Sequence, residues 1–112
     1  YLEARIEFAV SQGVKRTNIV IDPGIGFGKT QKHNLVLLRG LALFHSLGCP
    51  ILLGASRKRF IGTISGSEDV NTRMPGSLAV ALAAVAQGSQ FVRVHDVLET
   101  VQALKLWGAV RF

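Results

Sequence analysis

The amino-acid sequence predicts an α/β fold in which parallel strands alternate with helices. Three short apolar runs, at residues 19–21, 51–53 and 91–92, begin near residues 18, 50 and 91 and are therefore 32 and 41 residues apart. That spacing is about what one strand and its crossover helix require. Because the runs lack polar alternation, we expect a parallel sheet that is buried on both faces.

Helical patterns occupy the segments beside these runs. The four expected helices cover residues 2–13, 33–47, 75–87 and 96–107, and glycines 13, 48 and 108 end the first, second and fourth. The third carries almost no charge on any side, so we expect it to be buried all round. The fourth opens with Asp96 and Glu99 at the spacing of an N-cap acid and a capping-box glutamate.

The number of strands points to an incomplete barrel. Three parallel strands and four helices leave sheet edges unpaired that a closed barrel would pair. We therefore expect residues 1–112, a helix followed by three βα units, to be the C-terminal portion of a larger barrel of the TIM (β/α)8 kind or a processed fragment. An intact barrel of eight strands needs about 250 residues. No run approaches the roughly 18 apolar residues of a membrane span and no signal-peptide pattern is present, so we expect a cytoplasmic protein without membrane contact.

Charge indicates the class of ligand. The chain has 13 Lys and Arg residues against 7 Asp and Glu, a formal net charge of +6, and many of the basic residues stand near the strand ends. This distribution favours an anionic ligand. Aromatic residues are few and no recognition-helix pattern is found, so a phosphorylated small molecule is favoured over nucleic acid. The single cysteine, Cys49, cannot form an internal disulfide and is interpreted as structural.

A polar loop follows each apolar run, where the carboxyl ends of parallel strands hold ligands. The first loop, residues 22–29, reads Asp-Pro-Gly-Ile-Gly-Phe-Gly-Lys. It is not a nucleoside-triphosphate loop, because Pro23 stands where that spacing needs glycine, and Lys29 likewise breaks the dinucleotide fingerprint. The alternate glycines would let the backbone approach a flat ligand, with Phe27 available for ring contact. A plain βα turn is the alternative for the glycines.

Three side chains in these loops have chemistry suited to such a ligand. Asp22 offers two acceptor oxygens to an aminopyrimidine or guanidine-like edge, although an Asp before Pro-Gly also suits a simple turn. Arg93 and His95 stand two residues apart on one expected strand, so they point to the same side and could grip one diphosphate. A surface salt-bridge pair is the alternative for these two.

Residues 22–29, 56–62 and 93–97, together with Gly-Ser-Leu-Ala at 76–79, resemble the dihydropteroate synthase family over essentially the whole chain. The resemblance implies a partial pterin-binding TIM-barrel domain at 1–112. It implies a folate-pathway transferase that joins 6-hydroxymethyl-7,8-dihydropterin diphosphate to 4-aminobenzoate, releasing pyrophosphate and 7,8-dihydropteroate. Sulfonamides compete for the aminobenzoate place in this family.

The resemblance also implies roles for individual residues. Asp22 would hold the aminopyrimidine edge of the pterin, and Lys58 its polar edge, while the Lys58 stem lines the aminobenzoate pocket with Gly26 and Phe27. Arg93 and His95 would bind the diphosphate and stabilise its leaving charge. No residue is expected to act as a nucleophile: a cation at the pterin methylene carbon would be captured by the arylamine, so the enzyme supplies position and charge.

Further residues are expected to line or support the site. Arg59 lies at the aminobenzoate pocket and stands where many relatives have serine, so a backbone amide is the alternative holder of the carboxylate. Ser56 and Arg57 flank Lys58, and Arg57 could equally pair with a structural carboxylate. Lys29 and Asn34 are expected to support the glycine loop.

The resemblance also implies a cofactor and an assembly. Mg²⁺ would assist departure of the diphosphate, with its ligand in the missing N-terminal half and no metal ligand in this chain. His33 and His45 lack metal-ligand spacing and are interpreted as structural. The last helices would suit a homodimer interface. We expect little or no turnover from this chain alone.

Two alternatives belong to other classes. Another pterin-binding TIM-barrel enzyme, of the methyltetrahydrofolate methyltransferase type, could share Asp22 but would not need Ser-Arg-Lys at 56–58 and Arg-x-His at 93–95 as an anion grip. A non-catalytic polyanion-binding module would bind through net charge, with an affinity that falls steeply with salt and ignores Asp22.

Overall fold

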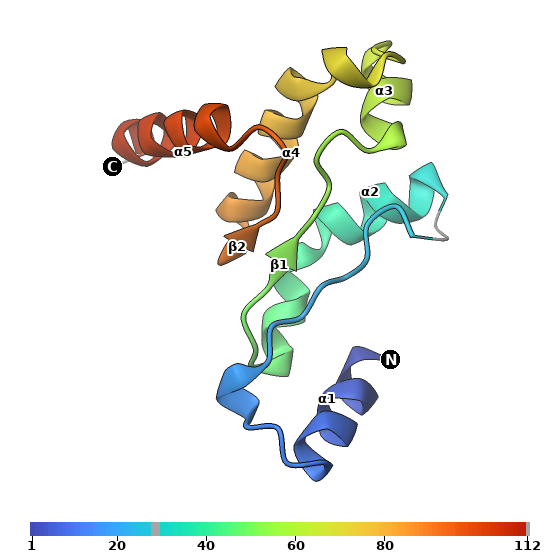
Figure 1. Cartoon of the computed structure of the whole chain (residues 1–112), viewed down its shortest axis with the longest axis vertical. Helices are drawn as coiled ribbons and strands as arrows, with labels where there is room; N and C mark the ends of the chain where they lie inside the picture. Colours follow the sequence, from blue (N-terminus) through green and yellow to red (C-terminus); the bar gives the residue numbers. More distant parts are fainter. Residues whose placement is uncertain (28–29, 112) are drawn as a thin grey trace.

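The structure is a computed structural model that describes residues 1–27 and 30–111. The elements are α1 (Leu2–Ser11), η1 (Arg16–Asn18), α2 (Gln31–Arg39), η2 (Leu41–Leu47), β1 (Leu52–Leu53), α3 (Arg59–Ser65), η3 (Val70–Thr72), α4 (Met74–Ala86), β2 (Phe91–Val92) and α5 (Val97–Arg111). Figure 1 shows an elongated molecule with α1 at one end, α3, α4 and α5 toward the other, and the strands between them. No described helix is both long and apolar enough to cross a membrane.

The predicted parallel pairing is confirmed, although the regular strands are short. β1 and β2 are parallel neighbours, in which Leu52 is opposite Phe91 and Leu53 is opposite Val92. The first apolar run adds an isolated parallel bridge between Ile21 and Ile51. The three runs therefore lie side by side in chain order.

The sheet is covered on one face only, so the prediction of burial on both faces is wrong for this chain. Partners across a parallel ladder point to the same face. The face that carries the bridge packs into the core, which contains Ile21, Ile51 and Leu53 with relative exposures of 4%, 0% and 2%. The opposite face is open, and Val20 and Phe91 on it are 45% and 50% exposed. Apolar runs predict burial of a strand, but they do not say that the covering residues belong to the same chain.

The second expected helix is interrupted at Gly40, between α2 and η2. In a continuous α-helix the N–H of Ala42 would donate to the carbonyl of Leu38, four residues earlier. Here the Gln87 amide stands between these groups: its Nε2 donates to the Leu38 carbonyl, and its Oε1 accepts from the Ala42 N–H at 3.0 Å. A side chain inserted into the helical ladder from the end of α4 thus accounts for the break.

Two further boundaries differ from the prediction. Residues 59–65, where the sequence predicts no helix, form α3, whose Phe60 and Ile61 are buried and which ends at Gly66 with φ 79°. Glycine and β-branched residues are poor helix formers, so the helical signal in this segment is weak. α5 continues through Gly108 to Arg111.

The prediction that the third helix is buried all round is also wrong. On α4, Ser77, Ala81 and Ala84 are buried, whereas Ala79 and Ala83 are exposed. The helix contacts α3 and α5 on its flanks. Its remaining face meets no described part of the chain, and its small apolar side chains are left open.

Candidate functional site

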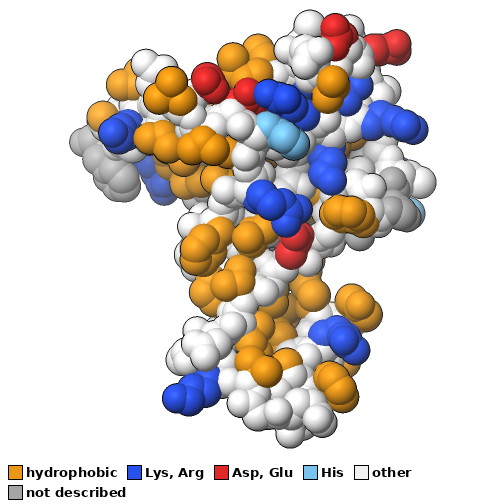
Figure 2. Space-filling view, in the orientation of Figure 1, with side chains coloured by type: hydrophobic (Ala, Val, Ile, Leu, Met, Phe, Trp, Pro, Cys, Tyr) orange, Lys and Arg blue, Asp and Glu red, His pale blue; other side chains and the backbone are white. Residues whose placement is uncertain are grey.

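The loops that follow the three parallel runs meet at the carboxyl edge of the sheet, as the sequence predicted. The space-filling view in Figure 2 shows Lys, Arg and His side chains on the part of the molecule near this edge, with an acidic side chain among them. The predicted site residues that the structure describes come from the segments 22–27, 56–59 and 93–95. The site is therefore assembled from all three βα units.

Asp22 follows the bridge residue Ile21 and serves two neighbours. Its Oδ1 accepts from the N–H of Gly24 at 2.8 Å, which closes the turn that the alternative interpretation of Asp-Pro-Gly required. Its Oδ2 lies 3.7 Å from Nη1 of Arg93. One carboxylate oxygen thus fixes the loop, and the other faces the site.

The glycine loop is held in place by a buried side chain of α2. Oδ1 of Asn34, a residue only 4% exposed, accepts from the Gly26 N–H at 2.9 Å, which confirms the expected support. Gly26 has φ +86°, and an added Cβ would lie 3.2 Å from Cδ of Lys58. The Lys58 ammonium lies 4.3 Å from the centroid of the Phe27 ring, within cation–π range. Glycine at 26 therefore lets Lys58 cross the loop and reach Phe27.

Arg57 is the structural centre of the second loop. It has φ 56°, a left-handed conformation that is costly for a residue with a side chain. Its N–H donates to Oγ of Ser77 at 2.8 Å and its carbonyl accepts from Nη1 of Arg73 at 3.2 Å. Its guanidinium donates to both carboxylate oxygens of Asp96, at 3.2 and 2.7 Å. Arg57 is therefore held by three partners: Ser77 on α4, Arg73 at the N-cap of α4, and Asp96 just before α5.

The ion pair shifts the titration of both partners. The hydrogen bonds from Arg57 hold the pKa of Asp96 below its usual value, with a smaller Coulombic contribution from the same guanidinium. The hydrogen bond to Asp96 raises the pKa of Arg57 in turn. The sequence left open whether Arg57 pairs with a structural carboxylate. The structure shows that it does, and the carboxylate is that of Asp96.

Ser56 orients His95 across the same edge. Oγ of the buried Ser56 accepts from the backbone N–H of His95 at 3.2 Å and lies 3.0 Å from its Nδ1. Arg93 and His95 were expected on the third strand, but β2 ends at Val92, so both residues follow the strand. The Arg93 N–H nevertheless donates to the Leu53 carbonyl at 2.8 Å, which continues the ladder.

Two cavities flank Lys58. One, of about 490 Å³, is lined by Gly26, Gln31, Asn34, Lys58, Arg59, Phe60 and Thr63. The other, of about 260 Å³, is lined by Gly54, Ser56, Lys58, Arg93, Val94 and His95. Lys58 therefore stands between a cavity next to the glycine loop and a cavity with three basic or imidazole side chains.

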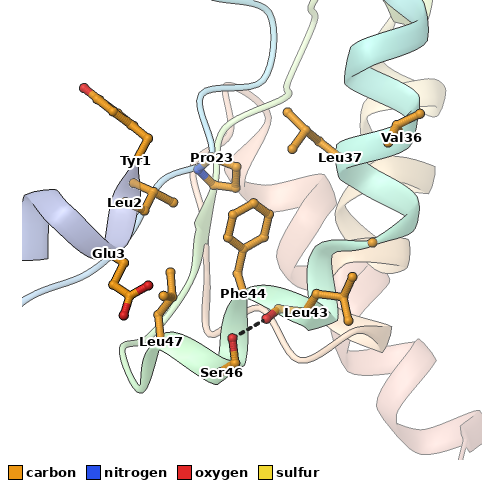
Figure 3. Close-up of a pocket in the computed structure, with 11 residues that line it drawn as sticks. Tyr1, Leu2, Glu3, Pro23, Val36, Leu37, Leu43, Phe44, Ser46 and Leu47 are labelled. Carbon is orange, nitrogen blue, oxygen red and sulfur yellow. Dashed lines mark hydrogen bonds between the residues drawn. The ribbon is translucent and has the colours of Figure 1, made fainter.

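A larger cavity of about 580 Å³ lies elsewhere, between α1 and the η2 region. Figure 3 shows its lining, in which Leu2, Leu37 and Phe44 surround the space and Pro23 comes from the loop after Asp22. Ser46 is engaged with the carbonyl of Leu43 at 3.0 Å. This lining is mostly apolar and offers an anion no cationic partner, so it is not part of the candidate site.

The described residues do not fit a magnesium site. Among residues 1–27 and 30–111, no group of three or more His, Cys, Asp or Glu side chains could hold a metal ion. Asp22 faces Arg93 and Asp96 is bound by Arg57, so each of these two carboxylates already has a cation beside it. Lys29, expected to support the glycine loop, lies outside the described residues.

Comparison with known proteins identifies the family of this chain. Residues 1–95 match the family described as "Pterin binding enzyme". The chain belongs to the pterin-binding enzyme family. The match includes Asp22, Lys58, Arg93 and His95, and thus all three loops of the site.

Several individual proteins that resemble this chain are dihydropteroate synthases. The chain is 48% identical over 111 residues to dihydropteroate synthase of Neisseria meningitidis serogroup C, covering 98% of this chain and 39% of that protein. Dihydropteroate synthase from Thermus thermophilus in complex with 4-aminobenzoate matches with TM-score 0.93 and 49% identity, covering 99% of this chain and 44% of that one. The same enzyme in complex with 6HMPPP matches with TM-score 0.93 and 49% identity, covering 99% and 43%. The chain thus spans about two fifths of the length of these relatives.

Proposed function

We propose that this chain carries the pterin-binding and diphosphate-binding parts of a dihydropteroate synthase site. The observation that carries the proposal is the position of Lys58 between the two cavities, with Asp22 and Arg93 side by side at the same edge. A molecule that joins a flat, hydrogen-bonding ring to a diphosphate would need such a pair of neighbouring sites. The relatives that bind 4-aminobenzoate and 6HMPPP support this choice of substrates.

In the proposed complex, Asp22 accepts two hydrogen bonds from the aminopyrimidine edge of the pterin. Its Oδ2 already faces the site, and the turn to Gly24 fixes its direction. Lys58 donates to the polar edge of the ring. Its stem, which passes Gly26, forms one wall of the cavity proposed for 4-aminobenzoate, with Phe27 and Arg59 beside it. The aromatic amine would thus face the pterin methylene carbon.

Arg93 and His95 act on the diphosphate. As the bond between the methylene carbon and the diphosphate oxygen breaks, negative charge grows on the leaving group, and hydrogen bonds from cationic donors strengthen with that charge. Ser56 holds the His95 ring in place for this purpose. The arylamine nitrogen then forms the new bond to the methylene carbon and loses a proton to water or to the departing diphosphate. No side chain of this chain needs to act as a nucleophile.

The open faces of the chain suit a larger enzyme. In a TIM barrel, the face with Val20, Leu52 and Phe91 would line the interior, and additional strands would cover it. The exposed alanines of α4 and the exposed Leu98 and Val110 of α5, 78% and 85% accessible, would suit a homodimer interface through the last helices. Sulfonamide binding at the aminobenzoate cavity, a magnesium ligand outside these residues and a cytoplasmic location remain predictions.

A binding experiment distinguishes this proposal from the alternative that the chain is a polyanion-binding module. The 112-residue chain is checked for folding by circular dichroism and titrated with 6-hydroxymethyl-7,8-dihydropterin diphosphate in a calorimeter. We expect saturable binding that Asp22→Asn weakens by about ten- to a hundredfold, the range for hydrogen bonds to a charged group. Glu7→Gln on the exposed side of α1 makes the same change in net charge and should leave the affinity unchanged.

Each result decides between the candidates. Binding that ignores Asp22→Asn but disappears at moderate salt would favour the polyanion module. Absence of binding to the folded chain would overturn the proposal that these residues carry the two binding sites. Addition of 4-aminobenzoate to the bound complex tests the expectation of little or no turnover by the chain alone, and substantial dihydropteroate formation would contradict it.

A further inference from the structure

Gly54 follows β1 directly, and its lack of a side chain determines the course of Arg93. A Cβ placed on this buried glycine would meet only the Arg93 guanidinium among its three nearest atoms, with Cζ at 2.8 Å and Nε at 3.0 Å and Nη2 closer still. Real Cβ atoms do not approach other atoms so closely, so the guanidinium occupies the space that any other residue at position 54 would fill.

Crossing this glycine brings Arg93 to Asp22. Nη1 of Arg93 lies 3.7 Å from Oδ2 of Asp22, and the two side chains are 57% and 36% exposed. The ion pair is therefore partly solvated and weak. It nevertheless joins the two residues that, under the proposed function, bind opposite ends of one substrate.

We propose that Gly54 is a positioning residue that couples the pterin and diphosphate sites through this ion pair. The proposal rests on the proposed function and extends it. In this structure, Asp22 and Arg93 compensate each other's charge. A ligand that engages Asp22 alone has to give up this ion pair, whereas a ligand with a diphosphate supplies Arg93 with a new anion at the same time.

The consequence is reciprocal coupling between separate ligands. Pyrophosphate bound at Arg93 releases Asp22, so a pterin without a diphosphate binds more tightly in its presence, and the pterin enhances pyrophosphate binding by the same factor. Because a partly exposed ion pair contributes up to about 1 kcal/mol, the enhancement should be about two- to fivefold. Direct repulsion or steric conflict between the ligands would give the opposite sign.

The experiment measures the affinity of 6-hydroxymethyl-7,8-dihydropterin for the chain by calorimetry, with and without saturating inorganic pyrophosphate. We expect about two- to fivefold tighter binding with pyrophosphate in the natural sequence. Gly54→Ala keeps every charge but displaces the guanidinium, so the enhancement should vanish and the affinity without pyrophosphate should rise to the enhanced level. Arg93→Gln should remove the enhancement by removing the ion pair itself.

Gly108→Ala is the matched control, because nothing lies within 4 Å of a Cβ at that position. It should keep the full enhancement. Gly54→Ala should remain folded, since the three atoms nearest to the added Cβ belong to the end of a flexible, half-exposed side chain. If it does not fold by circular dichroism, Arg93→Gln alone decides. This variant also weakens pyrophosphate binding, so its pyrophosphate concentration is raised until the site is saturated.

The outcomes separate this inference from the proposed function. Pterin diphosphate binding that depends on Asp22, without any effect of pyrophosphate on the bare pterin, overturns the coupling and leaves the proposed function intact. Enhancement that persists in Gly54→Ala and Arg93→Gln also overturns it, because the coupling then runs through another contact. Failure of the folded natural chain to bind either ligand overturns both.

Discussion

The two edges of the small sheet use polar residues in opposite ways. At the carboxyl edge, charged side chains such as Asp22 and Arg93 are partly exposed and contact each other only loosely. At the amino edge, neutral side chains satisfy backbone groups: Oε1 of Gln90 accepts from the Ile51 N–H at 2.9 Å, and Oγ of Ser89 donates to the Phe91 carbonyl at 2.8 Å. The comparison teaches that one edge holds the fold together, and the other keeps its charges accessible to a ligand.

Gln87 should show the largest effect at the amino edge. Its amide occupies the break between α2 and η2, where it bonds to the Leu38 carbonyl and the Ala42 N–H. Gln87→Ala leaves both groups without this partner, so we expect the free energy of unfolding to fall by about 1–3 kcal/mol. Urea denaturation followed by circular dichroism measures the change, and calorimetry with pyrophosphate should give an unchanged affinity per folded molecule.

Two variants sharpen this test. Gln102→Ala, on an exposed position of α5, should change stability by no more than about 0.5 kcal/mol. Gln87→Glu keeps an acceptor for Ala42 but replaces the donor to Leu38 by a second oxygen, so it should destabilise as Gln87→Ala does. A loss of pyrophosphate affinity in parallel with stability would show that the two edges are not separable in this way.

Asp96 should show a smaller effect, and one that depends on pH. Because the bonds from Arg57 lower the pKa of Asp96 in the folded chain, its contribution to stability is fully present above the usual value of 3.8 and is lost as the pH falls through the lowered value. Asp96→Asn should therefore be less stable than the natural chain at neutral pH, and the difference should shrink in acid, below about pH 4. Urea midpoints between about pH 3 and pH 7, a range that spans the usual aspartate pKa, measure it.

The Asp96 prediction has a control variant and a result that would contradict it. Gln102→Ala, which changes an exposed position of α5 without a titratable group, should leave the pH dependence of stability as it was. A difference between Asp96→Asn and the natural chain that stays constant over the whole acid range would mean that the Asp96–Arg57 pair does not titrate as its hydrogen bonds imply.

The sequence predicted the arrangement of the sheet because apolar runs and loop residues report on a parallel strand directly. It placed Asp22, Lys58 and Arg93 at one edge from the order of the runs alone. It could not reveal the break at Gly40, because the cause is Gln87, a residue 45 positions away along the chain from Ala42. Local patterns carry no information on a side chain that inserts from another helix.

The same limit explains what was missed within the site. The sequence predicts ligand binding by Lys58 and leaves open whether Arg57 contacts the ligand or pairs with a structural carboxylate. In the structure, Arg57 adopts φ 56° and turns to Asp96, while Ser56 turns to His95. Gly54 has no side-chain chemistry to suggest a role, since its importance lies in the space it leaves for Arg93. A glycine directly after a strand and before a charged loop is the pattern that could have drawn attention to it.

Thr30 should show the smallest effect, and it tests how much a helix cap at the carboxyl edge contributes to stability. Its side chain accepts from the His33 N–H at 3.2 Å and so caps α2, the helix whose Asn34 holds the glycine loop. Thr30→Ala should lower the free energy of unfolding by about 0.5–1 kcal/mol, the usual cost of losing such a cap, and Thr30→Ser should restore most of it. Because Asn34 remains bonded to Gly26 through the rest of α2, the affinity for pterin diphosphate should stay within about twofold, less than the loss of one hydrogen bond. Urea denaturation and calorimetry on the same samples give both numbers, and a roughly tenfold loss of affinity in Thr30→Ala that Thr30→Ser also shows would mean that the loop depends on the threonine methyl rather than on the cap.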